Sequence, residues 1–312
     1  MARVWIAVVG WMLAAEPAAA HVGPGDGDWP GWSSDPLVTL PLALAAFAYG
    51  QGVWRLWRAA GWGSGVRLWQ AGAFASGWLV LALALVSPLD GLGETYFSMH
   101  MVQHQALMLI AAPLLVLGSP PVAFLWALPP AWRRSVGALV HQRWWRAAWH
   151  ALSRPVTAWS LYALALWAWH APRLYEAALA GYWVHALQHT TFLVGALLFW
   201  QTAFDRSGGV AGRGMALLGV AVAAIHSSIL GALMTFANRP WYSHAAPPEA
   251  GLLLTPLEDQ QLAGLIMWVP GGLLHLLAGV ALAAMALHEA ERRARRGATI
   301  VLAEEAIGKA PR

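Results

Sequence analysis

The chain has 312 residues, of which 59% are hydrophobic and only 11% carry a charge. Soluble domains are about 25% charged and about half apolar, so this composition excludes a soluble globular domain and a disordered chain. The chain contains no cysteine, which excludes disulfides, thiolate metal ligands and CxxC redox motifs. The formal net charge of +4 fits the basic cytoplasmic loops of a membrane protein. The predicted partner is therefore the lipid bilayer, with no nucleic acid.

Residues 1–20 have the pattern of a secretory signal peptide. A basic residue precedes an apolar run over 4–15, and the alanines at 18–20 provide a cleavage site. The twelve apolar residues are too few to cross about 30 Å of hydrocarbon. We predict cleavage, with an uncleaved anchor as the alternative, and an outer N-terminal segment over 21–36. Cleavage would expose His21, whose amine and imidazole can chelate copper together, although a residue at such a junction is more often inert.

Seven further apolar stretches are long enough to cross a membrane. They lie at about 37–54, 67–87, 97–117, 156–170, 182–204, 214–236 and 260–287. Lipid offers no partners for backbone polar groups, and runs this long and unbroken indicate helices rather than the strands of a barrel. We predict an all-α polytopic membrane protein, in which a bundle of seven transmembrane helices over 37–287 follows the cleavable signal peptide.

The basic residues predict the orientation of this bundle. With the N-terminus outside, the inner segments contain sixteen of the nineteen Lys and Arg residues, and the outer segments contain two. The positive-inside rule therefore predicts a multi-pass protein of the bacterial cytoplasmic membrane, with a cytoplasmic tail over 288–312. The connection at about 119–155 is rich in Trp and Arg, which is typical of interfacial helices on the inner leaflet.

Two histidine pairs share one spacing. His100 and His104, like His185 and His189, form an H-x-x-Q-H pattern at the outer end of a predicted span. Residues four apart lie on one face of a helix, about 5–6 Å apart at Cβ, so both imidazoles of a pair can reach one ion. Ionisable residues inside spans are costly and usually functional. Because the two pairs lie at matched depth, the four imidazoles are predicted to converge.

The residue types around these pairs favour copper. Imidazole suits Cu, Zn, Fe and Ni, and the thioethers of Met99, Met101 and Met108 near the first pair favour Cu(I). His170 ends the fourth span at the same outer side. The predicted metal ligands are His100, His104, His185, His189 and His170. The alternative is that these histidines and methionines are packing residues held by hydrogen bonds and apolar contacts.

Other polar residues are predicted to lie apart from this site. His226 is at mid-depth in the sixth span, and His275 is too deep in the seventh to join easily, so it is interpreted as a packing residue or a proton step. Pro113 and Pro270 are predicted to bend their spans. Four acidic residues predict an outer rim that either attracts a cation or is merely solvated: Asp90, Glu176, Glu258 and Asp259.

Several of these motifs together resemble one known family. The run from Phe97 to His104, followed by Ala112 to Pro120, resembles the signature of the CtaG family, the polytopic (caa3-type) branch of cytochrome c oxidase assembly factors. Further resemblances follow in the same order, at Trp169 to Tyr175, at His185 to His189 with Phe199-Trp200, and at Asp259 to Gly264 with Met267-Trp268. The resemblance covers about 35–287. It implies about seven spans, cytochrome c oxidase subunits as partners, and a role in oxidase maturation that is often discussed as copper delivery.

Three functions are compatible with the sequence. The first is an assembly factor that holds a transferable copper ion without chemical turnover, and so is not an enzyme. The second is a membrane redox enzyme, since paired histidines on adjacent helices can also ligate haem or a redox metal. The third is a metal permease with a histidine relay, which would usually show inverted repeats or a polar path through both leaflets. The histidines gather in the outer half, which favours the first function.

Overall fold

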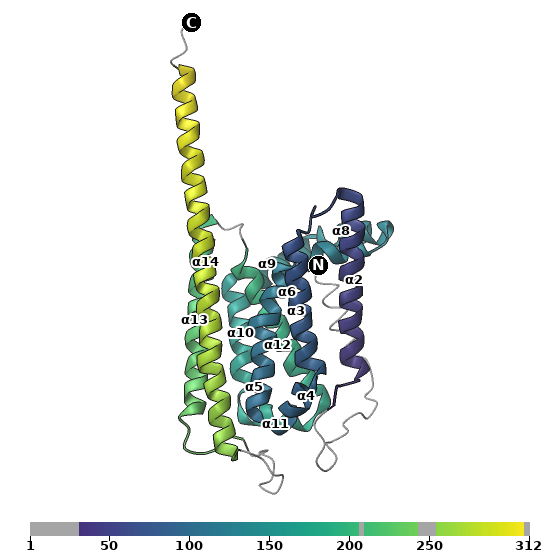
Figure 1. The fold of residues 1–312 in the computed structure, drawn as a ribbon, viewed down its shortest axis with the longest axis vertical. Helices are drawn as coiled ribbons and strands as arrows, with labels where there is room; N and C mark the ends of the chain where they lie inside the picture. Colours follow the sequence, from purple (N-terminus) through teal and green to yellow (C-terminus); the bar gives the residue numbers. More distant parts are fainter. Residues whose placement is uncertain (1–30, 206–208, 243–253, 309–312) are drawn as a thin grey trace.

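The computed structural model of the chain describes residues 31–205, 209–242 and 254–308. All the regular structure within these ranges is helical, as the sequence predicts (Figure 1). The predicted signal peptide at 1–20 and the candidate chelator His21 lie outside the described residues.

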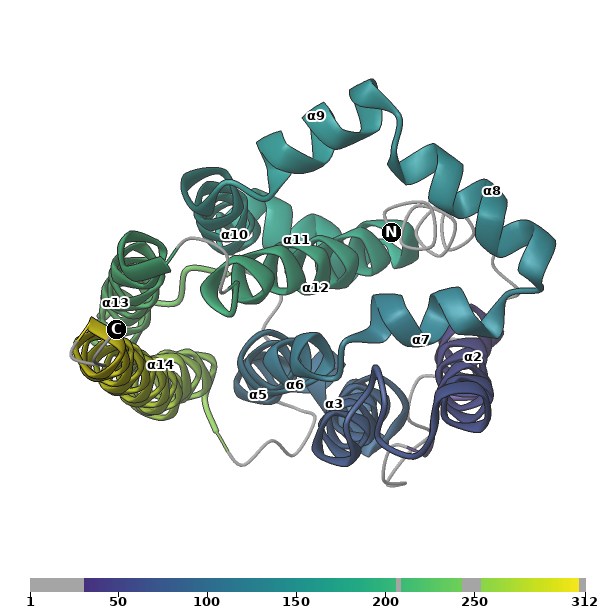
Figure 2. The ribbon, with the colours of Figure 1, turned by 90° about the horizontal axis from the view of Figure 1, so that it is seen from above.

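The long helices run side by side along one axis of the molecule (Figure 1). They are α2 (Pro36–Ala60), α3 (Leu68–Val86), α5 (Phe97–Gln105) continued by η1 (Ala106–Ala111) and α6 (Ala112–Leu117), α10 (Pro155–Trp169), α12 (Tyr182–Ala203), α13 (Gly209–Thr235) and α14 (Pro256–Gly308). Within the described residues, five segments are long and apolar enough to cross a membrane, at 36–60, 68–86, 97–117, 211–235 and 256–291. The shorter α10 and the more polar α12 pack against each other in the same bundle (Figure 2). The chain is thus a multi-pass membrane protein.

Short helices cover the two ends of the bundle (Figures 1 and 2). One end carries α4 (Pro88–Thr95) and α11 (Pro172–Ala180), which the sequence analysis did not predict. The other end carries α7 (Pro120–Ala127), α8 (Pro130–Val140) and α9 (Arg143–Leu152), so the predicted helices at 119–155 are present. In Figure 2 α8 and α9 lie across the bundle rather than along it. This orientation suits an interfacial position.

Proline sets where many of these helices begin. Seven of the described helices have proline as their first residue: α2, α4, α7, α8, α10, α11 and α14. The first N–H groups of a helix have no intrahelical acceptor, so proline loses nothing there, and its fixed φ already suits the helix. These prolines divide a uniformly apolar sequence into separate elements.

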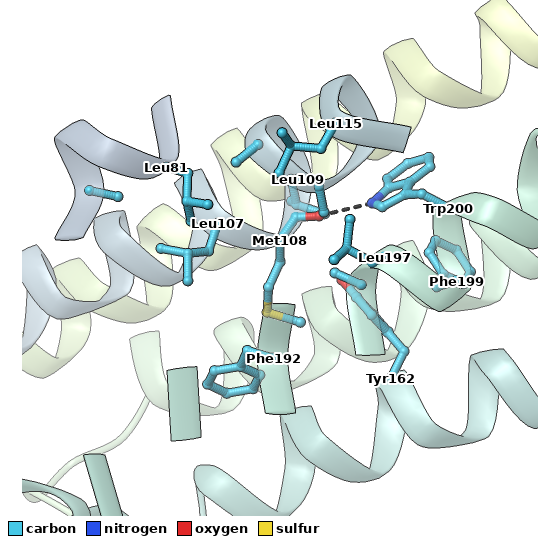
Figure 3. Packing of buried hydrophobic residues seen from close by; sticks show 14 of the residues in the cluster. Leu81, Leu107, Met108, Leu109, Leu115, Tyr162, Phe192, Leu197, Phe199 and Trp200 are labelled. Atoms are coloured by element: carbon cyan, nitrogen blue, oxygen red, sulfur yellow. Dashed lines mark hydrogen bonds between the residues drawn. The ribbon is translucent and has the colours of Figure 1, made fainter. Parts of the chain in front are cut away.

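The core at the centre of the bundle is built around the irregular third span. Close to the bend predicted at Pro113, the backbone forms the π-helical turn η1 instead of a regular α-helix. Figure 3 shows Met108 of this turn pointing towards Phe192, while the indole of Trp200 is directed at the backbone of Met108. All three residues are at most 2% exposed. The turn is therefore held by tight packing against α12.

Glycine brings α13 and α14 into close contact. A Cβ added to Gly231 would lie 2.7 Å from the carbonyl oxygen of Gly264, and one added to Gly264 would lie 2.5 Å from that of Gly231. Small residues are the usual means by which helices approach each other in lipid. Near the other end of the pair, the guanidinium of Arg213 bonds the carboxylate of Glu289. These contacts fix α14, which supplies a residue to the site described next.

Candidate metal centre

The two predicted histidine pairs come together at the end of the bundle that carries α4 and α11. His100 and His104 lie in α5, and His185 and His189 lie in the first turns of α12. The ring centroid of His100 lies 5.4 Å from that of His185 and 5.8 Å from that of His189. The rings of His104 and His189 are 5.2 Å apart. We call these four residues the imidazole cluster.

Three members of the imidazole cluster lie close enough together that they could hold a metal ion. His100, His185 and His189 each offer one ring nitrogen, and these three atoms all lie within 4.8 Å of one another. Bonds of about 2.0 Å to one shared ion would place the nitrogens no more than about 4 Å apart. Small side-chain rotations, closing a gap of about 1 Å at most, would bring the three nitrogens onto one ion.

The imidazole cluster contains buried ring nitrogens that no hydrogen bond satisfies. Nε2 of His100, Nε2 of His189 and both ring nitrogens of His104 are buried without a hydrogen-bond partner. His100 and His104 are only 1% and 2% exposed. Buried polar atoms in proteins are nearly always paired, and each exception calls for a reason. For Nε2 of His100 and Nε2 of His189 a metal ion would be such a reason, whereas the neutral ring of His104 carries a proton on one of its nitrogens and has a single lone pair to offer.

His170, the fifth predicted ligand, faces a different partner. It follows the last residue of α10, is 4% exposed, and directs Nδ1 at the carbonyl oxygen of Leu166 at 2.6 Å. Its Nε2 lies 3.4 Å from the sulfur of Met101, which occupies the turn between His100 and His104. His170 is close enough to both of these histidines to interact with them electrostatically. It therefore borders the imidazole cluster and turns its free nitrogen towards sulfur.

The other predicted methionines lie in different surroundings. Met108 is 2% exposed and belongs to the apolar core of Figure 3, beside Phe192. Met99 lies in α5 and is partly exposed. Met101 is thus the thioether that the structure places against a candidate ligand.

The glutamine of each H-x-x-Q-H pattern is also buried. Gln103 and Gln188 are at most 1% exposed. Nε2 of Gln103 donates to the carbonyl oxygen of Ala84 and to Oδ1 of Asp90, both at 2.7 Å. This amide ties the turn that carries His100 to α3 and α4, so Gln103 positions the first histidine pair.

The acidic rim predicted at the outer end is wrong for Asp259. This residue of α14 is only 9% exposed, and its carboxylate accepts hydrogen bonds from the backbone N–H groups of Phe97 at 2.6 Å and Ser98 at 3.0 Å. Those N–H groups begin α5 and have no acceptor within the helix. A negative charge at a helix N-terminus is favourable. Asp259 is therefore a cap supplied by another helix rather than a member of a solvated rim.

Aromatic rings cover the imidazole cluster next to this cap. The ring centroid of Tyr175 lies 5.5 Å from that of His100. The ring centroid of Phe97 lies 4.9 Å from that of Tyr175, and the ring centroid of Tyr242 lies 4.4 Å from it. The Tyr242 hydroxyl donates to the backbone carbonyl of His170 at 3.0 Å. Burial, with Tyr242 and Asp259 beside it, raises the pKa of Tyr175 well above its ordinary value, so its hydroxyl stays protonated. Phe97 and Tyr175 belong to the runs that carry the family resemblance, but the sequence does not show that they and Tyr242 pack together over the histidines.

The two deeper histidines lie apart from the imidazole cluster, as predicted. His226 of α13 has both ring nitrogens without a hydrogen-bond partner and packs beside Trp159. His275 of α14 is 1% exposed and directs Nδ1 at the carbonyl oxygen of Gly271 at 2.8 Å. His226 lies near enough to His275 for a charge on one ring to act on the other.

Comparison with known proteins identifies the family. The model of the cytochrome c oxidase caa3 assembly factor family (Caa3_CtaG) matches residues 47–289, which include every histidine of the imidazole cluster and His170. The chain belongs to the CtaG family. The family match begins within α2 and ends at residue 289 of α14, so all the helices that build the site belong to the CtaG domain.

Curated relatives of this CtaG chain are larger proteins. Proteins of Mycobacterium bovis and Mycobacterium tuberculosis, both described as uncharacterized, are each 26% identical to it over 289 residues. The match covers 85% of this chain and 40% of each relative, so the chain spans well under half of their length. No solved structure matches the chain.

Proposed function

We propose that this CtaG protein helps to assemble cytochrome c oxidase by holding copper at the imidazole cluster and passing it to an oxidase subunit. One observation carries the proposal: His100, His185 and His189, from two different helices, direct three ring nitrogens to within 4.8 Å of one another. Membership of the caa3 assembly factor family supports oxidase assembly as the process and an oxidase subunit as the partner.

The donor set favours copper as the cargo. Neutral imidazole binds borderline metals, and the nearby thioether of Met101 favours Cu(I) over Zn²⁺. Three nitrogens leave a coordination position open, as in sites where a ligand must enter or leave. An incoming ligand from an oxidase subunit can use that position, so the ion is exchanged rather than locked in place. The proposal assigns no chemical turnover to the protein.

The proposed topology puts this site on the outer side of the membrane. Five of the predicted spans are helices long and apolar enough to cross a membrane, and α10 and α12 are taken as the other two. The imidazole cluster lies at the end of the bundle that carries α4 and α11 (Figure 1). The opposite end carries α8 and α9, which hold Arg133, Arg134, Arg143 and Arg146. Basic residues mark the cytoplasmic side of bacterial membrane proteins. Copper would then reach an outward-facing oxidase site without crossing lipid.

A complementation experiment tests this function in cells. A strain that lacks the protein is supplied with wild type or with the His185→Ala/His189→Ala variant at equal membrane levels, and cytochrome c oxidase activity is measured. These two side chains are only half-buried, so the bundle should fold without them. We expect the variant to lose oxidase activity and to regain part of it when copper is added to the medium.

The matched control is His288→Ala, which removes an exposed imidazole from the opposite end of α14. It should support full oxidase activity. Full activity of the double variant without added copper would contradict the proposal and leave the histidines as structural residues. A visible haem spectrum in the purified protein would instead favour a redox enzyme.

A further inference from the structure

Beside the imidazole cluster, two buried electron-pair donors face each other. Nε2 of His170 and the sulfur of Met101 are 3.4 Å apart, and these side chains are 4% and 1% exposed. His170 comes from the end of α10, whereas Met101 comes from α5. The two atoms are therefore brought together by the packing of the bundle and not by their spacing along the chain.

The hydrogen bond made by Nδ1 of His170 determines whether Nε2 carries a proton or a lone pair. Nδ1 of His170 lies 2.6 Å from the carbonyl oxygen of Leu166, and a carbonyl oxygen can only accept. The proton of the neutral ring is therefore on Nδ1, and Nε2 carries a lone pair. The thioether of Met101 has no proton to donate. Two lone pairs thus face each other in a buried place, with no hydrogen atom between them.

We propose that Nε2 of His170 and Sδ of Met101 form a second copper site, separate from the imidazole cluster and specific for Cu(I). Metal bonds to nitrogen and sulfur of about 2.0 and 2.3 Å, at their observed separation, enclose an angle of about 105° at the ion. That angle suits an ion with three or four ligands. The ring is already oriented by its Leu166 hydrogen bond, as in metal sites where a backbone carbonyl holds the second nitrogen.

The His170–Met101 pair lies next to the imidazole cluster, so it can pass a copper ion to that cluster or receive one from it. Met101 lies between His100 and His104 on α5, so an ion moves between the two sites over the length of one helical turn. Thioether sulfur is soft and binds Cu(I) in preference to Zn²⁺. The pair therefore selects Cu(I), while the imidazole cluster alone would also accept zinc. The inference rests on the proposed copper role and adds a step of metal selection to it.

X-ray absorption at the copper edge of the purified full-length protein, loaded with Cu(I) in detergent, tests the second site. We expect the wild type to show a sulfur shell at about 2.3 Å together with nitrogen at about 2.0 Å. Met101→Leu keeps the side-chain volume and should remove the sulfur shell completely. Met234→Leu, which changes a fully buried methionine of α13, should leave the shell intact. Zinc-loaded wild type should show no sulfur shell.

A labelling measurement keeps the test valid if Met101→Leu does not fold. Growth on selenomethionine replaces the sulfur of all nine methionines with selenium and should convert the sulfur shell into a selenium shell. Copper bound by nitrogen alone would overturn the second site while leaving the proposed function intact, and would mean that a charged His170 simply donates Nε2–H to the thioether. A wild type that binds no copper would overturn the proposed function as well.

Discussion

The indole N–H of Trp200 donates a 2.8 Å hydrogen bond to the backbone carbonyl of Met108 (Figure 3). In an α-helix that carbonyl would accept the N–H of Ala112, but Ala112 bonds the carbonyl of Leu107 in the π-helical turn η1. The next residue, Pro113, has no N–H to give. Trp200 therefore satisfies a carbonyl that the π turn and the proline together leave free, one helical turn below His104.

Trp200→Phe should destabilise the protein, because it leaves the Met108 carbonyl buried without a donor. The expected cost is about 1–3 kcal/mol, measured by denaturation of the detergent-solubilised protein. Trp159→Phe is the matched control, because the Nε1 of Trp159 is buried with no hydrogen-bond partner. The control should change stability little or raise it. Equal losses in the two variants would mean that ring volume matters and the hydrogen bond does not.

Asp259→Asn should loosen the start of α5, where His100 lies. The amide keeps one acceptor oxygen but loses the negative charge, so one of the N–H groups of Phe97 and Ser98 loses its partner. We expect a loss of about 1–2 kcal/mol, which is typical of a helix cap. Glu291→Gln, the same kind of change at an exposed position further along the same helix, should stay within about 0.5 kcal/mol. Thermal denaturation of both variants in detergent compares them directly.

Gly264→Ala should separate α13 from α14. The new Cβ would lie 2.5 Å from the backbone oxygen of Gly231, which cannot move aside as a flexible side chain would. Overpacking of this kind typically costs about 1–3 kcal/mol. Gly279→Ala, in the same helix but with open space around it, should be neutral or stabilising by up to about 1 kcal/mol. If denaturation in detergent gives the two variants the same stability, the close contact between the helices does not exist.

The absence of cysteine makes the proposed topology directly testable with single introduced cysteines. Arg173→Cys in α11 and Gln142→Cys between α8 and α9 are both exposed positions at opposite ends of the bundle. A membrane-impermeant maleimide should label the first in intact spheroplasts and the second only after lysis. The reverse pattern would place the imidazole cluster on the cytoplasmic side and contradict outward delivery of copper.

The sequence was sufficient to predict features that depend on neighbouring residues, such as apolar runs and the spacing of histidines along one helix. Five of the seven apolar runs are helices long and apolar enough to cross a membrane. The i,i+4 spacing predicted that each histidine pair shares a helical face. Matched depth in the two spans then predicted that His100 and His189 approach each other, and their rings are 5.8 Å apart. The metal itself remains a prediction, because geometry alone does not select an ion.

Features that depend on contacts between distant segments could not be predicted in this way. Asp259 was interpreted as part of a charged rim because its sequence position gives no sign that it caps α5, more than 150 residues earlier. His170 was grouped with the other histidines by depth, although the packing of α10 turns its ring towards Met101. Pro113 predicted an irregular helix, but the π turn also requires the indole of Trp200 from α12.

The affinity of the purified protein for Cu(I), measured by competition with a chromophoric chelator, tests the central claim most directly. Wild type is compared with His185→Ala/His189→Ala, with His288→Ala as the control. We predict tight binding by wild type and control, and binding at the imidazole cluster more than about 100-fold weaker in the double variant, since loss of outer-shell partners alone costs about 10–100-fold. Because the double variant keeps the His170–Met101 pair, the number of copper ions bound per protein is recorded together with the affinity. Absence of copper binding by the wild type, or the same number of ions and the same affinity in all three proteins, would contradict the account.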